Sequence, residues 1–396
     1  MDLLYISYSY YFEYRNGVIY SMPAYGYSFW YKYLSVFSSI VIVGEPVRKG
    51  MDKTKMVPIT DPRIRLLIIP ENINPKDFKN DPIIKKELEK CIKAYDAIII
   101  QPTSRKGIMA IRIAKHYRKT YILEFTGDLQ SSLKTNKNII KRLYAPFIHR
   151  KIIKNISDAK YGLYVTRYYL QKIYPIKGIK CGCTDTFVPS SSYVVLEKRL
   201  EKINNMKGRI VLGLIGSYSG RRKGVDTAIK ALSFLEDCVE LHILGLGTEE
   251  EKNNWIEYAE KKGVTNRLFF DTPLSSVDDV FAWIDSIDIC ILPSRSEGLP
   301  RSIVESNSRA CPAVTSNVCG LQELVDKKWT HNPNDYHRLK DLLSSMISNK
   351  KLMMEAALQN FETSKAYSSD NLAEIRNRFF TEYLFNLKKE NDRYDK

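Results

Sequence analysis

The chain has 396 residues, a length that suits two domains better than a single hydrophobic core. Hydrophobic residues make up 44% of it and charged residues 27%, which excludes a disordered or fibrous protein. No apolar run reaches the roughly 18 residues of a membrane-spanning helix, and the start lacks the features of a signal peptide, so we expect a cytoplasmic protein.

The net charge of +16 is concentrated in the first half of the chain. Residues 1–200 hold 34 Lys and Arg against 16 Asp and Glu, or +18, whereas residues 201–396 hold 27 against 29, or −2. Residues 101–200 alone hold 20 against 5, or +15. This asymmetry indicates an anionic partner, for which nucleic acid, an anionic membrane and a phosphorylated substrate all qualify. No nucleic-acid motif accompanies the charge, so we expect no nucleic-acid partner.

Short apolar runs alternate with amphipathic stretches through the first half, which is typical of an α/β fold with a parallel sheet. The predicted strands cover residues 3–7, 40–43, 65–69, 97–100 and 121–125, and the predicted helices cover residues 30–37 and 108–118. Asn16-Gly17 is a turn signal after the first strand.

Two carboxylates accompany the predicted strand at residues 121–125. Glu124 lies within the strand, and we expect it to be paired or to face a cleft, because burying a lone charge is costly. Asp128 follows the strand, where it either addresses a ligand or caps the next segment.

Residues 141–154 combine an apolar stripe with cations. Pro146 is expected to break or kink a helix here. The combination suits the surface of an anionic membrane, while an amphipathic helix packed on its own sheet is an equal alternative. The cations are Lys141, Arg142, Arg150, Lys151 and Lys154.

A serine cluster followed by charged residues predicts an interdomain connection between Pro189 and Arg209. Strands and helices then alternate again: strands at 210–215, 240–244 and 268–270, helices at 225–235, 249–262 and 277–285, then helices at 336–347, 351–363 and 369–387 before a solvated tail. Thr248 is a predicted helix cap. The Gly245-x-Gly247 pair lacks the third glycine of a dinucleotide fingerprint.

The cysteines do not form a metal motif. Cys181-Gly-Cys183 has the wrong spacing for a zinc site, and no second pair with histidine partners follows. We therefore expect free thiols and no metal site.

The most informative stretch runs through residues 288–325. An apolar strand at 288–292 leads into a loop with Glu297, and a helix that starts near Pro300 carries Glu305. The loop lies at the carboxyl end of a strand, where open α/β sheets bind ligands. The two carboxylates can therefore address one polyol ligand from two sides. Free backbone N–H groups around Leu299, Arg301 and Ser302 supply an anion site beside them.

These residues stand in a longer pattern, Pro-Ser-x-x-Glu-Gly-Leu-Pro followed by Glu-Ser-x-Ser-Arg-x-x-Pro-Ala-Val. The pattern resembles the donor-sugar motif of retaining glycosyltransferase family 4, which includes bacterial capsule and cell-envelope enzymes of the GT-B fold. The resemblance implies two Rossmann-like domains that face a central cleft. The expected parts are an acceptor-binding domain at 1–195, a nucleotide-sugar-binding domain at 206–368, and a C-terminal helix at 369–396 that crosses back to the first domain.

The resemblance also implies roles for single residues. Glu297 would contact the donor sugar at its reacting face, Gly298 and Leu299 would present backbone donors, and Glu305 would hold the ribose hydroxyls. Lys223 matches the family lysine that binds the diphosphate.

Three positions depart from the family pattern. The family arginine after the glycine equivalent to Gly216 is replaced by Ser217, so Arg221 or Arg222 would supply the second cation, unless both are ordinary loop residues. The family often has two glycines after the first strand, and here Gly17 stands alone as a donor-loop glycine or a simple turn. Many members have a histidine where this chain has Asp128, which completes the expected catalytic set with Glu297 and Lys223.

The implied function is transfer of a sugar, with retention, from a UDP- or GDP-linked donor to a glycan or polyprenyl-linked acceptor in bacterial surface polysaccharide synthesis. No metal cofactor is expected, and the basic half is expected to bind the inner face of the cell membrane peripherally. The alternative is a catalytically silent GT-B protein that binds glycan or a partner subunit. Such a protein would be expected to lose Glu297, Glu305 or Lys223, and all three are present.

Overall fold

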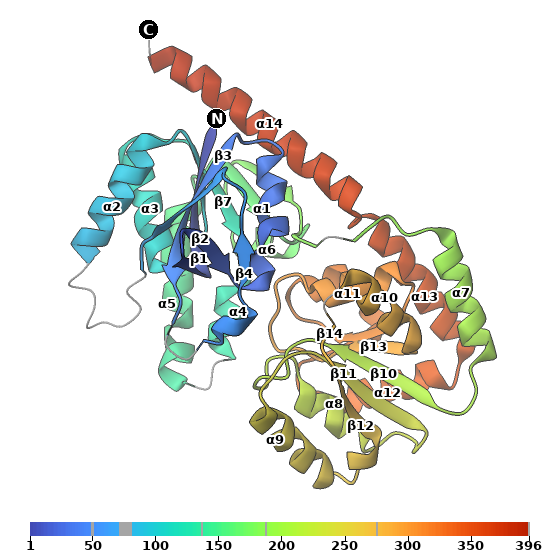
Figure 1. Ribbon diagram of the computed structural model, residues 1–396. Helices are drawn as coiled ribbons and strands as arrows, with labels where there is room; N and C mark the ends of the chain where they lie inside the picture. Colours follow the sequence, from blue (N-terminus) through green and yellow to red (C-terminus); the bar gives the residue numbers. More distant parts are fainter. Residues whose placement is uncertain (49–50, 71–80, 136–137, 187, 275, 395–396) are drawn as a thin grey trace. The chain divides into compact units, whose positions relative to one another are not determined.

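The computed structural model describes residues 1–48, 51–70, 81–135, 138–186, 188–274 and 276–394 (Figure 1). The chain divides into two compact units. Unit 1 comprises Met1–Gln130, Leu143–Asp185 and Ala373–Lys396, and unit 2 comprises Ser131–Arg142 and Thr186–Leu372. Each unit is built around its own sheet.

The sheet of unit 1 is parallel through most of its width, with the order β5-β3-β1-β6-β7-β8-β9. The strands β6, β7 and β8 are buried along their whole length, because helices cover both faces of a doubly wound sheet. The bounds are β1 (Asp2–Arg15), β3 (Ser39–Pro46), β5 (Ile64–Ile68), β6 (Ala97–Ile100), β7 (Ile122–Phe125), β8 (Tyr161–Tyr164) and β9 (Ile179–Gly182).

The first strand is longer than predicted. It continues to Arg15 and folds back into β2 (Val18–Ser21), which pairs with it antiparallel and is extended by β4 (Val57–Ile59). Asn16 (φ 48°) and Gly17 (φ 79°) form the turn, and two consecutive left-handed residues are the signature of a tight two-residue hairpin. Of the two readings of Gly17, the structure supports the simple turn.

Helices flank the sheet of unit 1 (Figure 1). They are α1 (Tyr27–Leu34), α2 (Asp81–Ala94), α3 (Arg105–His116), α4 (Leu129–Lys134), α5 (Ile139–Ile156), α6 (Tyr169–Ile173) and α14 (Ser369–Tyr394), of which most of α4 and the starts of α5 and α14 fall in unit 2. Of the two predicted effects of Pro146, a break or a kink, the break is wrong, because α5 continues through the proline. Pro146 removes the N–H that the Arg142 carbonyl would accept, and both residues are exposed, so water can take its place. None of the described helices combines the length and the apolar character needed to cross a membrane.

The last helix packs on the sheet of unit 1. The Tyr383 hydroxyl accepts from the Ile98 N–H at 3.0 Å and donates to the Thr120 carbonyl at 3.1 Å. The expectation of a solvated tail after residue 387 is wrong, because α14 continues to Tyr394. Glu390 holds this extension to the unit, since it accepts from the Thr120 hydroxyl at 2.6 Å and pairs with Lys160 at 2.5 Å.

Unit 2 has a fully parallel six-stranded sheet in the order β12-β11-β10-β13-β14-β15. Its strands are β10 (Ile210–Ile215), β11 (Val239–Leu244), β12 (Leu268–Asp271), β13 (Ile289–Leu292), β14 (Ala313–Ser316) and β15 (Thr330–His331). Its helices include α8 (Val225–Leu232), α9 (Glu249–Glu260), α10 (Val277–Ser286), α11 (Arg301–Ser308), α12 (Tyr336–Ile347) and α13 (Lys350–Lys365). The prediction of an α/β protein with two Rossmann-like sheets is confirmed.

A further helix, α7 (Tyr193–Asn205), occupies the segment where the interdomain connection was expected. Arg199 fixes it to unit 2, because its buried guanidinium donates to the carbonyls of Ile284 at 2.9 Å and Ile287 at 2.7 Å. Leu196 adds an apolar contact with Phe361. Helix α7 is therefore part of the packing of unit 2.

Candidate functional site

The candidate site lies where the strand order of unit 2 reverses. β10 and β13 are neighbours in the sheet, and the chain leaves each of them at its carboxyl end. Such a reversal opens a crevice between the two loops, because the crossovers from the two strands run in opposite directions. The Arg295 N–H donates to the Arg222 carbonyl at 2.8 Å, so the two loops are joined directly.

Two glycines of the loop after β10 occupy closely packed positions, and one of them allows the approach of the two loops. Gly224 has φ 75°, and a Cβ there would lie 2.0 Å from the Pro293 carbonyl oxygen. Gly216 has φ 153°, and a Cβ there would lie 2.8 Å from the Lys223 Cε. A side chain at position 224 would push the two loops apart, whereas one at position 216 would displace the flexible end of the Lys223 side chain.

The pair Gly245 and Gly247 also serves packing. A Cβ on Gly245 would lie 2.0 Å from the Gly216 carbonyl oxygen, and one on Gly247 would lie 2.0 Å from the Tyr218 ring. The two glycines let the loop after β11 pass against the loop after β10. The close packing of the two loops therefore explains both glycines, and binding of a dinucleotide is not needed to explain them.

The centre of the site is a buried ion pair. The Lys223 Nζ lies 2.8 Å from Glu297 Oε1, and the Ser294 hydroxyl donates to the same oxygen at 2.7 Å. Arg222 donates to the other carboxylate oxygen at 3.3 Å. Burial lowers the pKa of Lys223 and the nearby Arg222 adds to this, while Glu297 opposes the shift. The pair places a cation and an anion together at the floor of the crevice.

The two arginines beside Lys223 have different partners. Arg222 contacts Glu297, whereas Arg221 lies 3.5 Å from Asp226. Asp226 is already held by both terminal nitrogens of Arg295, at 2.9 and 2.8 Å. Of the two candidates for a second cation, the structure therefore brings Arg222 to Glu297 and Lys223, and holds Arg221 at the Asp226 pair.

The helix after the second loop carries Glu305. α11 begins directly after Pro300, and the backbone N–H groups of Arg301 and Ser302 have no partner within the described ranges. Such N–H groups attract anions. Glu305 is half-buried, and burial raises the pKa of its carboxyl against the opposing charge of Arg301. The loop itself is anchored, since the Gly320 N–H donates to the Gly298 carbonyl at 2.9 Å.

Two predicted site residues lie in unit 1. Asp128 is buried, and its carboxylate accepts from the hydroxyls of Tyr169 at 3.0 Å and Tyr174 at 3.2 Å. Gly17 forms the hairpin turn described above. The predicted residues that the structure brings together around the Lys223–Glu297 pair belong to unit 2.

Glu124 is paired, as expected. It is buried on β7, where the Tyr33 hydroxyl donates to it at 2.6 Å and the Tyr5 hydroxyl donates to its other oxygen. Burial raises the pKa of Glu124, while the charge of Lys32 opposes the shift. Tyr5 and Tyr33 were not identified from the sequence, because they precede Glu124 by about a hundred residues.

Sequence reasoning also missed three residues at the site. Ser294, Asp226 and Arg295 hold the two loops and the carboxylate of Glu297 in place. Ser294 could have been found, because it belongs to the Pro-Ser-x-x-Glu pattern. The Arg295–Asp226 pair had no such signal, since it depends on the pairing of β10 with β13.

The next question is whether side chains are placed to bind a metal ion. In the part of the chain that the structure describes, no group of three or more His, Cys, Asp or Glu side chains is placed to hold an ion. All seven cysteines are free thiols.

Comparison with known proteins points to one family. Residues 209–349 match the family of glycosyl transferases group 1. Protein CapJ of Staphylococcus aureus is 27% identical over 363 residues, which cover 89% of both chains. The N,N'-diacetylbacillosaminyl-diphospho-undecaprenol alpha-1,3-N-acetylgalactosaminyltransferase of Campylobacter jejuni is 24% identical over 324 residues, covering 76% of this chain and 81% of that protein. The structure of Anabaena HepE in complex with UDP superposes with a TM-score of 0.64 at 14% identity, over 98% of this chain and 100% of that one.

Proposed function

We propose that this chain, whose residues 209–349 match the glycosyl transferases group 1, transfers a sugar from a UDP- or GDP-linked donor to a glycan or polyprenyl-linked acceptor with retention of configuration. The observation that carries the proposal is the buried Lys223–Glu297 pair at the crevice between β10 and β13. The proposed setting is bacterial surface polysaccharide synthesis, and the Campylobacter jejuni protein, whose name contains a sugar linked to diphospho-undecaprenol, supports the polyprenyl-linked acceptor.

In this proposal the donor diphosphate lies beside Lys223. The reaction breaks the bond between the sugar C1 and the diphosphate oxygen, so negative charge develops on the leaving group. Lys223 stabilises this charge and Arg222 is the second cation. A phosphate beside Lys223 also offsets the cost of burying its ammonium group, which Glu297 alone offsets only in part.

The carboxylates bind the two ends of the donor. Glu297 accepts from the hydroxyls of the donor sugar near C1, where positive charge develops as the bond breaks. Glu305 accepts from the ribose hydroxyls, and the N–H groups of Gly298, Leu299, Arg301 and Ser302 supply donors around the loop. The chemistry assigned to these residues uses hydrogen bonds and fixed charges and requires no metal ion.

A donor-hydrolysis screen over UDP-, GDP-, ADP- and CMP-sugars tests the proposal. We expect slow release of free nucleotide from a UDP- or GDP-sugar, and loss of this release in Glu297→Ala. Binding of a donor without turnover would instead favour the silent GT-B alternative. Hydrolysis of none of the donors, with no binding, would contradict both.

Donor binding should depend on pH through Lys223. The diphosphate needs the ammonium form, and burial lowers the pKa of Lys223, so the cation is lost at a lower pH than for an exposed lysine. We expect UDP affinity to fall by about tenfold per pH unit once the pH exceeds this lowered pKa. Lys223→Arg should abolish the fall, because arginine does not titrate in this range.

Calorimetric titration with UDP between pH 7 and pH 10 measures the effect. The arginine variant is the matched control, since it keeps the positive charge. The same pH dependence in both proteins would remove Lys223 from the diphosphate site.

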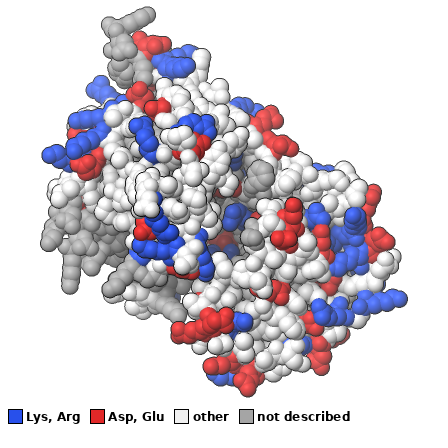
Figure 2. Space-filling model, in the orientation of Figure 1, with Lys and Arg blue, Asp and Glu red and all other residues white. Residues whose placement is uncertain are grey.

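The structure gives α5 two different halves. Its second half buries apolar side chains in unit 1, including Ile152 and Ile156. Its first half instead exposes apolar side chains, namely Ile139, Ile140, Leu143, Tyr144 and Phe147. On the face in Figure 2, Lys and Arg are interspersed with Asp and Glu, so that view shows no single basic field. We propose that the exposed half of α5 and its flanking cations bind the anionic inner face of the cell membrane.

Replacing Lys141, Arg142, Arg150, Lys151 and Lys154 with Glu should abolish binding to anionic vesicles. Each cation near such a surface contributes on the order of 1 kcal/mol, and the replacements make the contribution repulsive. Of these residues, the Lys141 side chain lies outside what the structure describes. Co-sedimentation with phosphatidylglycerol and phosphatidylcholine vesicles measures the effect.

The matched control carries the same five-residue charge reversal on exposed lysines of unit 2, at Lys207, Lys261, Lys262, Lys327 and Lys351. The control should keep most of the binding of the wild-type protein. Equal recovery on neutral and anionic vesicles, or equal loss in both variants, would contradict membrane docking through α5.

A further inference from the structure

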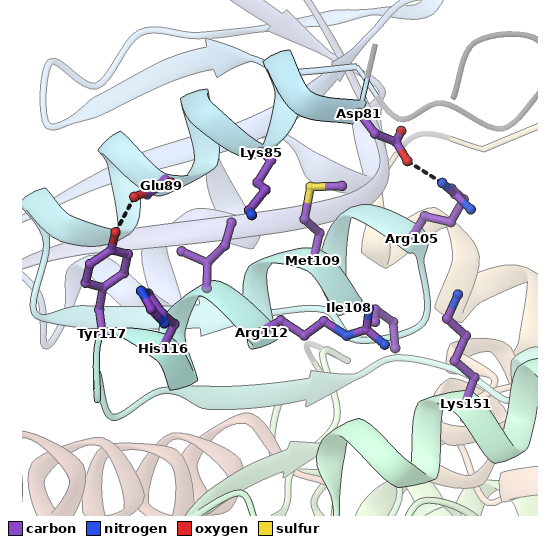
Figure 3. Close-up of a pocket in the computed structure, with 11 residues that line it drawn as sticks. Asp81, Lys85, Glu89, Arg105, Ile108, Met109, Arg112, His116, Tyr117 and Lys151 are labelled. Atoms are coloured by element: carbon purple, nitrogen blue, oxygen red, sulfur yellow. Dashed lines mark hydrogen bonds and ion pairs between the residues drawn. The ribbon is translucent and has the colours of Figure 1, made fainter. Parts of the chain in front are cut away.

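Unit 1 contains a groove of about 600 Å³ between α2, α3 and α5 (Figure 3). It is built from helices of one unit, and none of the residues assigned to the donor site contributes to it. Ile108, Met109 and Ile113 of α3 supply apolar lining, and charged side chains from all three helices surround it. The groove is therefore a separate site that the proposed transfer reaction does not use.

The acidic residues of the groove already have partners. Asp81 pairs with Arg105 at one end, and Glu89 accepts from the Tyr117 hydroxyl at the other (Figure 3). Glu89 also lies 3.1 Å from Lys93. Asp81 and Glu89 thus lie at the two ends of the groove, and the charge of Lys85 also acts on Glu89, whose pKa is lowered chiefly by the Tyr117 hydrogen bond.

Three exposed cations line the groove, one from each of three helices. They are Lys85 of α2, Arg112 of α3 and Lys151 of α5 (Figure 3). Within the described ranges none of the three has an ion-pair partner. Like charges around one groove repel each other, so a bound anion would stabilise this arrangement.

Arg112 is held in a defined orientation. Its Nε donates to the Asn155 side-chain oxygen at 3.0 Å, and the Asn155 amide donates to the Lys151 carbonyl at 2.7 Å. Asn155 is buried, and its side chain links Arg112 of α3 to the backbone of α5. The two terminal nitrogens of Arg112 stay available for the oxygens of an oxyanion, in the fork geometry that suits phosphate.

We propose that this groove binds a phosphate group, with Arg112 as the fork and Lys85 and Lys151 as the flanking charges. A phosphate offers enough oxygens for all three cations and carries enough charge to neutralise most of them. The phosphate belongs to a lipid headgroup, whose apolar part would lie along Ile108 and Met109, or to a soluble phosphate ester. The shared chemistry is the phosphate, and its two sources are separated by experiment.

Neighbouring residues provide a matched pair of double variants. Lys85→Glu with Lys151→Glu removes two groove cations, whereas Lys86→Glu with Arg150→Glu reverses two exposed neighbours that do not line the groove. Both double variants change the net charge equally and alter the same two helices. Each also reverses one of the five cations proposed to bind the membrane, Lys151 in one variant and Arg150 in the other. A difference between the two variants therefore reports on the groove and not on general attraction to a membrane.

Inorganic phosphate is the first probe, titrated calorimetrically at constant ionic strength in a Lys223→Ala background so that phosphate at the donor site does not contribute. We expect the groove double to bind at least about tenfold more weakly, because each lost contact is a charge-assisted hydrogen bond. The control double should stay within about twofold of the Lys223→Ala parent. Thermal unfolding of both doubles checks that each is folded.

Equal weakening in the two doubles, or no detectable phosphate binding in the Lys223→Ala parent, would overturn the proposal. A second experiment, with phosphatidylglycerol vesicles and with glycerol 3-phosphate, distinguishes a lipid headgroup from a soluble phosphate ester. Loss of vesicle binding in the groove double alone supports a lipid headgroup, and loss of glycerol 3-phosphate binding alone supports a soluble ester. All of these experiments measure ligand binding and none measures sugar transfer. The test of the groove therefore stands even if the donor site is wrongly assigned.

Discussion

Glu297→Gln is expected to lower kcat by about 100-fold, a loss similar to that of removing one charge-stabilising group from an active site. The substitution keeps the shape of the side chain and its contact with the Ser294 hydroxyl, and removes only the charge. Without the carboxylate, the pKa of Lys223 falls further, because Glu297 is the group that opposes the effect of burial. Both the sugar and the diphosphate ends of the donor would therefore be affected.

Glu305→Gln provides the contrast. Glu305 is assigned to the ribose, which does not change during the reaction, so its loss should raise KM and leave kcat within a few fold. Steady-state kinetics on the true donor separate the two effects. An unchanged kcat in Glu297→Gln, or the same pattern in both variants, would mean that the two carboxylates are wrongly assigned.

Gly224→Ala is expected to have the largest effect on stability at the site. The backbone there is left-handed, which costs an alanine about 1 kcal/mol, and the new Cβ would lie 2.0 Å from the Pro293 carbonyl oxygen. Relieving this overlap requires the two loops to separate, at an additional cost of about 1–3 kcal/mol. Separation also moves Lys223 away from Glu297, so donor binding should weaken as well.

Gly220→Ala is the matched control. Gly220 has a similar φ of 67° but open space where its Cβ would be, so its substitution isolates the cost of the left-handed backbone. Thermal unfolding should show a midpoint several degrees lower for Gly224→Ala than for Gly220→Ala. Equal midpoints would contradict the role of Gly224 in bringing the loops together.

The sheets of both units could be predicted because their strands are short, apolar and buried on both faces. The strand at 97–100 matches β6 to the residue, and the predicted cap Thr248 forms the capping box with Glu251. The placement of Glu297 on a loop and of Glu305 on the helix after it is also confirmed, because it follows from the alternation of strand and helix around Pro300. These features depend on local patterns, so local reasoning suffices for them.

The differences arise where distant contacts override local signals. The hairpin of β1 and β2 replaces a predicted loop because β3 and β4 pair with its strands. Residues 388–394 have the composition of a solvated tail, but the contacts of Glu390 with Thr120 and Lys160 hold them against unit 1 as the end of α14. The division of roles between Arg221 and Arg222 depends on Asp226 and Arg295, which no spacing in the sequence connects.

The anomeric configuration of the product is the decisive measurement for retaining sugar transfer by this protein. The wild-type protein, supplied with the donor selected in the screen and its acceptor, is followed by proton NMR in the presence and absence of EDTA. We expect a product with the anomeric configuration of the donor sugar, formed at the same rate with and without the chelator. An inverted product, or a reaction that stops when divalent ions are removed, would contradict this expectation.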